Sequence, residues 1–290
     1  MGHAHNNSNM RRVTIALVLT GVFMVVEVIG GILSGSLALL ADAGHMLTDT
    51  MALALAAVAF HVSKRPADTR LTYGYQRFQI LAAFVNGLSL LFIVGWILFE
   101  AASRFITPRE VMGETMLVVA VAGLVVNIIS FTVLHGGDRE NLNIRGAALH
   151  VAGDLLGSVA AIVAAIVIIY TGWVQIDPIL SIAVAILILK SAWVLVKRSA
   201  HVLLEGAPEW LDIEVMRKHL VAEIPEVSSI HHVHVWGMTP QELMLTMHVC
   251  INTEPTDPTD IIRRVKAQLR EEYGIGHSTI ELEMDDCADH

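Results

Sequence analysis

The sequence predicts an all-α membrane bundle of six transmembrane helices, followed by a small cytoplasmic α+β domain. Three observations support this fold class. First, 54% of the 290 residues are hydrophobic and only 16% are charged, whereas about a quarter of the residues of soluble domains are charged. Second, long apolar segments occupy most of the chain up to residue 197. Third, the hydropathy falls sharply after Arg198, where short amphipathic segments begin.

Six segments meet or approach the length of about 20 apolar residues that a membrane-spanning helix requires. They are residues 13–33, 37–62, 78–104, 114–135, 144–171 and 177–197. None alternates polar and apolar residues as a β-barrel strand does, so we expect helices with internally satisfied backbone groups. The expected domains are an N-terminal cytoplasmic tail (1–12), a transmembrane domain (13–200) and a cytoplasmic domain (207–290).

Basic residues near the ends of the spans indicate their orientation, because such residues are concentrated on the cytoplasmic side. Six spans place both termini on one side of the membrane. That side carries Arg11, Arg12, Lys64, Arg65, Arg70, Arg77, Arg139, Arg145, Lys197 and Arg198. The opposite side carries only Arg104 and Arg109. We therefore expect a multi-pass protein of the inner membrane, in contact with lipid, with both termini in the cytoplasm.

The cytoplasmic domain is expected to have the element order α-β-β-α-β. The predicted elements are a helix at 211–224, strands at 229–236 and 243–251, a helix at 258–273 and a strand at 278–284. The second strand alternates regularly, with apolar residues on one face and His248 and Cys250 on the other. This pattern predicts a half-buried antiparallel sheet.

Net charge and cysteine content exclude two classes of protein. The formal charge of −9 and the lack of a basic stripe argue against a nucleic-acid partner, which would need cations to displace phosphate counterions. The only cysteines are Cys250 and Cys287, both in the polar C-terminal part. They favour a reduced cytosolic location over a disulfide framework.

The second and fifth spans each contain a His-x-x-x-Asp motif. His45 and Asp49 form one pair, and His150 and Asp154 form the other. Because residues four apart share a helix face, each helix can offer an imidazole and a carboxylate to a common point. Two neutral imidazoles and two carboxylates match tetrahedral Zn²⁺ and leave the occupied site electrically neutral.

A purely structural or an enzymatic role accounts for these pairs less well. One pair could serve only to hydrogen-bond helices, but an ionised Asp at mid-membrane costs about 2.5–3.5 kcal/mol on insertion scales, and here two spans carry one. A membrane metalloprotease is disfavoured, because the chain has no His-Glu-x-x-His. Glu27 and Asp42 could relay protons or hydrogen-bond a metal ligand, and a purely structural hydrogen bond explains them equally well. Asp177 precedes Pro178 and is expected to cap the sixth span, with no role in transport.

Several stretches together resemble the cation diffusion facilitator family. They are Ser36–Asp49, Tyr73–Arg77, the pair in the fifth span, Leu203–Pro208 and His231–Trp236. The resemblance implies a homodimeric metal/proton antiporter and not an enzyme, with His45, Asp49, His150 and Asp154 as its transport site. His at the first of these positions is typical of zinc-preferring members. Imidazole is also softer than carboxylate, which favours Zn²⁺, Co²⁺ or Cd²⁺ over Mn²⁺ or Mg²⁺.

The resemblance also suggests roles for residues outside the spans. Arg77 and Glu205 match an ion pair at the membrane–cytoplasm junction of the dimer, and solvated surface charges are the alternative. Some relatives bind a metal in the loop between the second and third spans through an Asp and two His. This chain keeps Asp68 but has Leu71 and Tyr75 at the matching positions, so we expect that loop site to be absent.

The family also binds zinc in its cytoplasmic domain, between subunits. The resemblance favours His231, His248 and Glu283 as ligands, with His277, Glu281 and Cys287 as weaker candidates. Surface histidines without a metal are the alternative. Strand alternation would place His231 on the face opposite to His232 and His234.

These observations predict an exporter in which cytosolic Zn²⁺ displaces protons from His45 and His150, because a ligating imidazole must be neutral. Protonation from the outside then releases the metal, driven by the inward proton gradient. Cd²⁺ or Co²⁺ as the main substrate remains an alternative. A membrane metal sensor, in which the spans only anchor the cytoplasmic domain, is the rival from another class.

Overall fold

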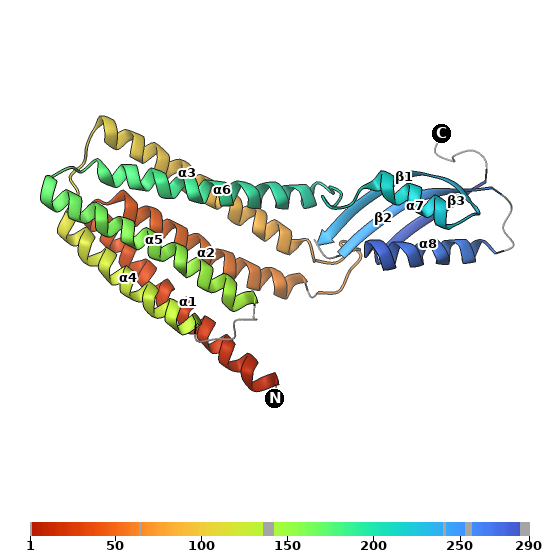
Figure 1. Ribbon diagram of the computed structural model, residues 1–290, viewed down its shortest axis with the longest axis horizontal. Coiled ribbons are helices and arrows are strands. Elements are labelled where there is room, and N and C mark those ends of the chain that lie inside the picture. The colour runs from red at the N-terminus through yellow and green to blue at the C-terminus, as the bar shows by residue number, and fades with distance from the viewer. Residues whose placement is uncertain (1, 64, 136–141, 240–241, 253–256, 285–290) are drawn as a thin grey trace. The chain divides into compact units, whose positions relative to one another are not determined.

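The computed structural model describes residues 2–63, 65–135, 142–239, 242–252 and 257–284. These residues form eight helices and three strands (Figure 1). In chain order they are α1 (Gly2–Ser34), α2 (Leu37–Ser63), α3 (Phe78–Ile106), α4 (Gly113–His135), α5 (Leu142–Thr171), α6 (Ile176–Leu203), α7 (Ile213–Glu223), β1 (Val227–Thr239), β2 (Glu242–Ile251), α8 (Pro258–Tyr273) and β3 (His277–Glu283). The chain divides into two compact units, residues 1–57 with 85–196 and residues 58–84 with 197–290.

The helices α1 to α6 correspond to the six predicted spans. Over the described residues, α3, α4, α5 and α6 each contain a stretch long and apolar enough to cross a membrane. The helices α1 and α2 contain shorter apolar stretches, Val18–Ser34 and Leu37–Thr48. The fold class predicted for this part of the chain is therefore confirmed.

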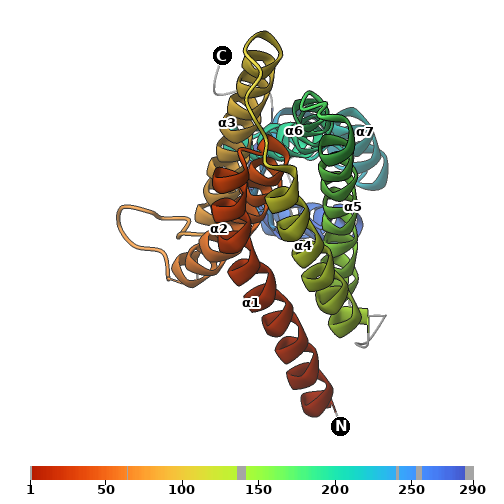
Figure 2. The same ribbon diagram turned by 90° about the vertical axis from the view of Figure 1, so that its left-hand side faces the viewer.

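Two clusters of buried side chains hold the helices of the first unit together. One joins α1, α4 and α5, and α4 lies alongside α5 and α1 in both views (Figures 1 and 2). The other joins α3 and α6. The helix α2 contributes to both, with Ala38, Leu39 and Met46 in the first cluster and Leu37 and Ala41 in the second. It therefore links the two groups of helices.

The turn between α1 and α2 requires a glycine. Gly35 has φ +72, in the left-handed region that residues with a Cβ rarely adopt. A Cβ at this position would also lie 2.8 Å from the backbone oxygen of Glu110.

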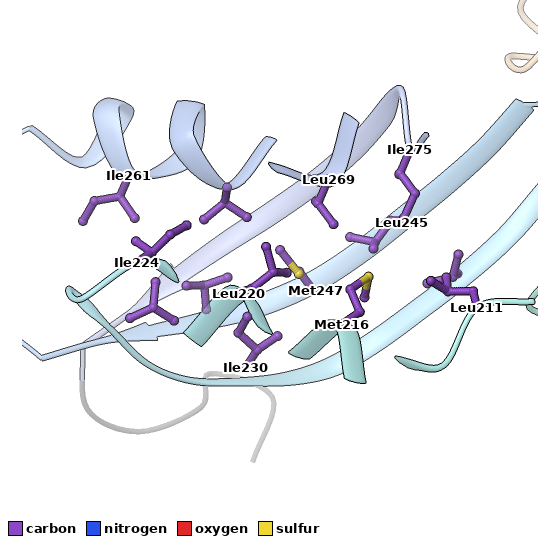
Figure 3. Close-up of a cluster of buried hydrophobic side chains, with 14 of the residues drawn as sticks. Leu211, Met216, Leu220, Ile224, Ile230, Leu245, Met247, Ile261, Leu269 and Ile275 are labelled. Atoms are coloured by element: carbon purple, nitrogen blue, oxygen red, sulfur yellow. The ribbon is translucent and has the colours of Figure 1, made fainter. Parts of the chain in front are cut away.

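Three strands and two helices form the core of the C-terminal part of the chain, in the predicted order α-β-β-α-β. One face of β2 presents Leu245, Met247 and Val249 to the helices. Met216 of α7 and Leu269 of α8 belong to the same buried cluster (Figure 3). Both helices therefore cover one face of the sheet, and the opposite face is left to the polar residues of β2.

Side-chain capping defines the ends of these two helices. Asp212 accepts hydrogen bonds from the backbone N–H groups of Glu214 and Val215 in α7, and Asp257 accepts one from the N–H of Thr259 in α8. Pro258 occupies the first turn of α8, and Gly274 ends it with φ 64.

The predicted antiparallel sheet is only partly right. The strands β1 and β2 are antiparallel, but β3 pairs with β2 in parallel. The reason is the connection: a helix, α8, lies between β2 and β3, and such a crossover returns the chain in the same direction.

Candidate metal sites

The two His-x-x-x-Asp motifs lie on α2 and α5. The side chains of Asp49 and His150 lie outside the described residues, although the backbone of each is helical. Of the other two, His45 is half-buried and Asp154 is 4% exposed. The helices α2 and α5 approach closely at Gly157, where a Cβ would lie 3.3 Å from an Asp42 carboxylate oxygen.

Three helices bring buried carboxyl groups into this region. Glu27 of α1 is 2% exposed, Asp42 of α2 is 9% exposed, and Asp154 belongs to α5. Asp42 also lies at the contact between α2 and α5, beside Gly157. Buried carboxyl groups from three helices are therefore part of this region of the bundle.

Candidate ligands also gather on the polar face of the C-terminal sheet. His248 Nδ1 lies 2.8 Å from Glu283 Oε1, and His231 Nε2 lies 3.1 Å from Glu283 Oε2. The carboxylate of Glu283 is 5% exposed. These three residues, the favoured ligand set, therefore lie together.

A bulge in β1 brings His232 to this group of ligands, although strand alternation would place it on the opposite face. His231 pairs with His248 and His234 pairs with Thr246, so three steps along β1 correspond to only two along β2. Within the bulge His232 has φ 48. As a result, ligand atoms of His231, His232 and His248 lie within 4.8 Å of one another. The predicted separation of His231 from His232 is therefore wrong, whereas His234 is exposed and belongs to neither group of ligands.

Cys250 is a ligand candidate that sequence reasoning missed. Its sulfur lies 3.6 Å from His231 Nδ1 and 3.7 Å from Glu283 Oε2. Its position two residues after His248, on the same face of β2, was the available signal. His231, Cys250 and Glu283 form a second group whose ligand atoms lie within 4.8 Å of one another.

The weaker candidates differ in their placement. Glu281 Oε2 lies 3.7 Å from His248 Nε2, and its side chain is 56% exposed. His277 is exposed at the start of β3 and belongs to neither group. Cys287 lies outside the described residues. The described donors, namely imidazoles, a thiol and a carboxylate, are those that Zn²⁺ prefers.

Arg77 and Glu205 form an ion pair within this chain. Arg77 donates to Glu205 Oε1 over 3.2 Å, and the two side chains are 29% and 62% exposed. Exposed pairs of this kind contribute little to stability. Any function of this ion pair therefore depends on where it lies in the chain, and not on its contribution to the free energy of folding.

Asp68 organises the loop between α2 and α3. Its carboxylate accepts hydrogen bonds from the backbone N–H groups of Arg70 and Leu71 and from the hydroxyl of Tyr75. The bond from Tyr75, with help from the two backbone bonds, lowers the pKa of Asp68 below its usual value. The carboxylate that some relatives use for a metal shapes the loop in this chain.

Comparison with known proteins gives the same assignment along nearly the whole chain. Residues 13–204 match the family model described as the cation efflux transmembrane domain, and residues 209–285 match the cation efflux protein cytoplasmic domain. The chain is 54% identical to the zinc transporter ZitB of Yersinia pestis, over 97% of this chain and 90% of that protein.

Two further relatives carry broader names. The chain is 42% identical to the metal cation efflux system protein CzcD of Cupriavidus metallidurans, over 99% of this chain and 91% of that protein. It is 43% identical to the cadmium, cobalt and zinc/H(+)-K(+) antiporter of Bacillus velezensis, over 98% of this chain and 92% of that protein.

Proposed function

Because the chain belongs to the cation efflux family of transporters, we propose that it is a zinc/proton antiporter that exports Zn²⁺ from the cytoplasm. The observation that carries this proposal is the pair of His-x-x-x-Asp motifs on two helices of the apolar bundle. The helices approach each other beside three buried carboxyl groups. The proposed ligands are His45, Asp49, His150 and Asp154.

The proposed transport step is an exchange of metal for protons. Cytosolic Zn²⁺ binds the two carboxylates and two imidazoles, and the imidazoles give up their protons because a ligating nitrogen must be free. A change in the packing of the helices then opens the site to the other side. Protons that enter from there return to the imidazoles and release the metal, and the inward proton gradient drives the cycle.

Glu27 and Asp42 are proposed to accompany the site as a proton relay or as hydrogen-bond partners of its ligands. The burial of both side chains supports this role. They lie on α1 and α2, and Asp42 also approaches α5 at Gly157.

The cytoplasmic domain is proposed to bind zinc through His231, His248 and Glu283, with Cys250 or His232 completing the site. The short distances from Glu283 to both imidazoles support this set. Glu281, His277 and Cys287 stay weaker candidates. We further propose a homodimer in the inner membrane, with both termini in the cytoplasm, the transmembrane domain at 13–200 and the cytoplasmic domain at 207–290.

Reconstitution in lipid vesicles tests the proposed function most directly. Zn²⁺ influx, followed with a trapped fluorescent indicator, should depend on an imposed pH gradient. Asp49→Ala and Asp154→Ala should abolish the flux, whereas Glu114→Ala, which removes an exposed acid at the start of α4, should preserve it. Gradient-dependent flux that survives both site substitutions would show that the site is wrongly assigned.

The same vesicle assay tests which metal is the preferred substrate and whether the protein is a transporter or a membrane metal sensor. Cd²⁺ and Co²⁺ are competing substrates, because a relative named for cadmium, cobalt and zinc is 43% identical. We expect a higher kcat/KM for Zn²⁺ than for either. A membrane sensor would bind metal but carry none, so wild-type vesicles without flux would favour that function.

A further inference from the structure

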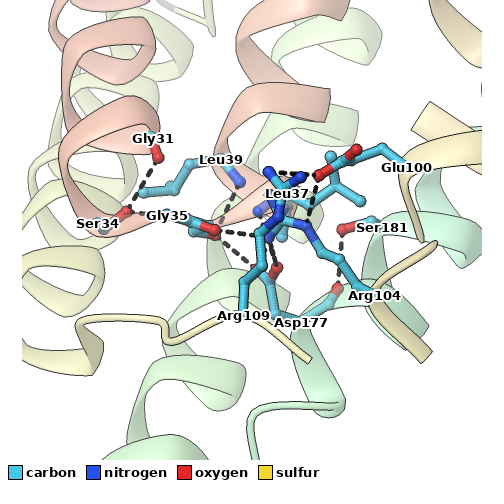
Figure 4. Close-up of polar contacts among 12 residues, drawn as sticks. Gly31, Ser34, Gly35, Leu37, Leu39, Glu100, Arg104, Arg109, Asp177 and Ser181 are labelled. Carbon is cyan, nitrogen blue, oxygen red and sulfur yellow. Dashed lines mark hydrogen bonds and ion pairs between the residues drawn. The ribbon is translucent and has the colours of Figure 1, made fainter. Parts of the chain in front are cut away.

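At the end of the bundle where α1 turns into α2, a buried carboxylate from α6 caps α2 (Figure 4). Asp177 accepts hydrogen bonds from the backbone N–H groups of Leu37, over 2.8 Å, and Ala38, over 3.1 Å. The hydroxyl of Ser36 donates to the same carboxylate over 2.6 Å and itself accepts from the N–H of Leu39. Asp177 was expected to cap its own helix, but it satisfies the first turn of a helix 140 residues earlier in the chain.

Arg104 ties a third helix to the same point. Its Nη1 donates to Gly35 O over 2.5 Å and to Asp177 Oδ2 over 3.3 Å. Glu100, one turn earlier on α3, accepts from Arg104 Nε over 3.2 Å and lies 3.0 Å from a guanidinium nitrogen of Arg109. We refer to Ser36, Arg104, Asp177 and the first turn of α2 as the clamp.

The clamp is buried and its charges are matched. Asp177 is 0% exposed and Arg104 is 6% exposed. An anion at a helix N-terminus is also stabilised by the helix dipole. Burying an ion pair is nevertheless expensive compared with apolar packing, and Ser36 alone could supply a local cap. The arrangement therefore adds directional polar contacts to the apolar packing that already connects α2 with α3 and α6.

The rest of α2 transmits this connection to the transport site. His45 lies eight residues beyond Leu37, about 12 Å along a helix, and Asp49 lies about 18 Å along it. Because a helix backbone is stiff over such distances, an anchored first turn fixes both the position of these residues along the helix axis and their orientation around it. The α5 pair lies on a helix that the clamp does not contact directly, so a shift of α2 changes the position of its ligands relative to those of α5.

We propose that Asp177 is a positioning residue for transport, which fixes through the clamp the helix that carries His45 and Asp49. The proposal rests on the proposed function, because it assumes that those residues bind the transported metal. Weakening the clamp lets α2 shift or rotate, so that its imidazole and carboxylate meet the α5 ligands less well. The metal is then held less tightly, although the fold and all four ligands remain.

Two serines provide a matched pair of substitutions. Ser36 and Ser181 are both 0% exposed, and both hydroxyls donate to Asp177. Ser36 binds the carboxylate and caps α2, whereas Ser181 binds the backbone oxygen of Asp177 within α6. Ser36→Ala weakens the clamp and Ser181→Ala leaves it intact, with the same change in side chain.

The test is the Zn²⁺ dependence of flux into vesicles that contain the full chain, at equal amounts of folded protein. Asp177→Asn should raise KM for Zn²⁺ about tenfold, the lower end of the loss caused by removing groups that orient metal ligands. Ser36→Ala should raise KM by less, and Ser181→Ala should leave it at the wild-type value. A merely structural role would lower the yield of folded protein and, at equal amounts of folded protein, leave KM unchanged.

A wild-type KM in Ser36→Ala, or an equal rise in Ser181→Ala, would overturn the proposal. If Asp177→Asn does not fold, the comparison of the two serines decides. Asp49→Ala, measured alongside, distinguishes failure of the clamp from failure of the proposed transport site. Loss of flux in Asp49→Ala with an unmoved KM in Ser36→Ala overturns the clamp alone, whereas normal flux in Asp49→Ala overturns the proposed site and the clamp's role with it.

Discussion

Replacing Glu283 by glutamine should weaken zinc binding by the cytoplasmic domain far more than the same change at Glu281. The carboxylate of Glu283 is 5% exposed and reaches both His231 and His248 within 3.1 Å. Glu281 is 56% exposed and reaches only His248, over 3.7 Å. Glutamine keeps the size of the side chain but loses the charge, so the comparison isolates the anionic ligand.

The magnitude follows from the position of Glu283 between two imidazoles. Loss of a group that binds or orients metal ligands costs about 10- to 100-fold in affinity. At a free Zn²⁺ concentration of about 100 times the wild-type Kd, binding stabilises the folded state by about 2.7 kcal/mol. With a Kd raised about 100-fold, the same concentration gives only about 0.4 kcal/mol. Most of the zinc-induced stabilisation should therefore disappear in Glu283→Gln.

Isothermal titration and thermal unfolding of the purified full chain measure both quantities. Asp154→Ala serves as the common background, so that zinc at the proposed transport site does not contribute. We expect a large loss of affinity in Glu283→Gln and a small one in Glu281→Gln. Equal losses in the two variants, or none in Glu283→Gln, would refute the reasoning that the buried carboxylate is the central ligand.

Three further predictions concern stability and the ion pairs. Leu269→Ala, which empties a fully buried position of α8, should destabilise the cytoplasmic domain by about 2–5 kcal/mol in urea unfolding. Arg77→Glu and Glu205→Arg should each lower Zn²⁺ flux, and the double reversal should restore it if the pair acts as a unit. The hydrogen bond from Arg264 holds the pKa of Glu226 below its ordinary value of 4.5. Its stabilising effect is therefore complete above about pH 4.5 and is lost as the pH falls through the lower folded pKa, so the difference in urea midpoint between wild type and Glu226→Gln should shrink on acidification.

Each of these has its own control. Val215→Ala, on the exposed side of α7, should leave the unfolding free energy nearly unchanged, in contrast to Leu269→Ala. A double reversal as inactive as the single ones would show that Arg77 and Glu205 do not act as a pair. A difference between wild type and Glu226→Gln that stays constant from neutral pH to about pH 3 would contradict the assigned cause of the pKa shift.

Hydropathy and helical spacing were sufficient for the transmembrane part. The apolar segments predicted the ends of α1 to α6 to within two residues, except for the start of α1 and the end of α6. The agreement arises because a bilayer requires long apolar stretches and fixes their length. The i,i+4 spacing identified His45 and Asp49 as a pair, because helix geometry alone places such residues on one face. Both inferences depend only on neighbours in the chain.

Contacts between distant parts of the chain were decided by the tertiary structure. Local rules assigned Asp177 to its own helix, but packing brings the first turn of α2 to its carboxylate. Strand alternation separated His231 from His232, whereas the bulge in β1 interrupts the period and brings them together. The sequence alone thus indicated most of the candidate metal ligands, with Cys250 as an exception, and the helices or strands on which they lie. Folding decided which of them meet, because burial of a charge is tolerated only where partners from other segments are brought against it.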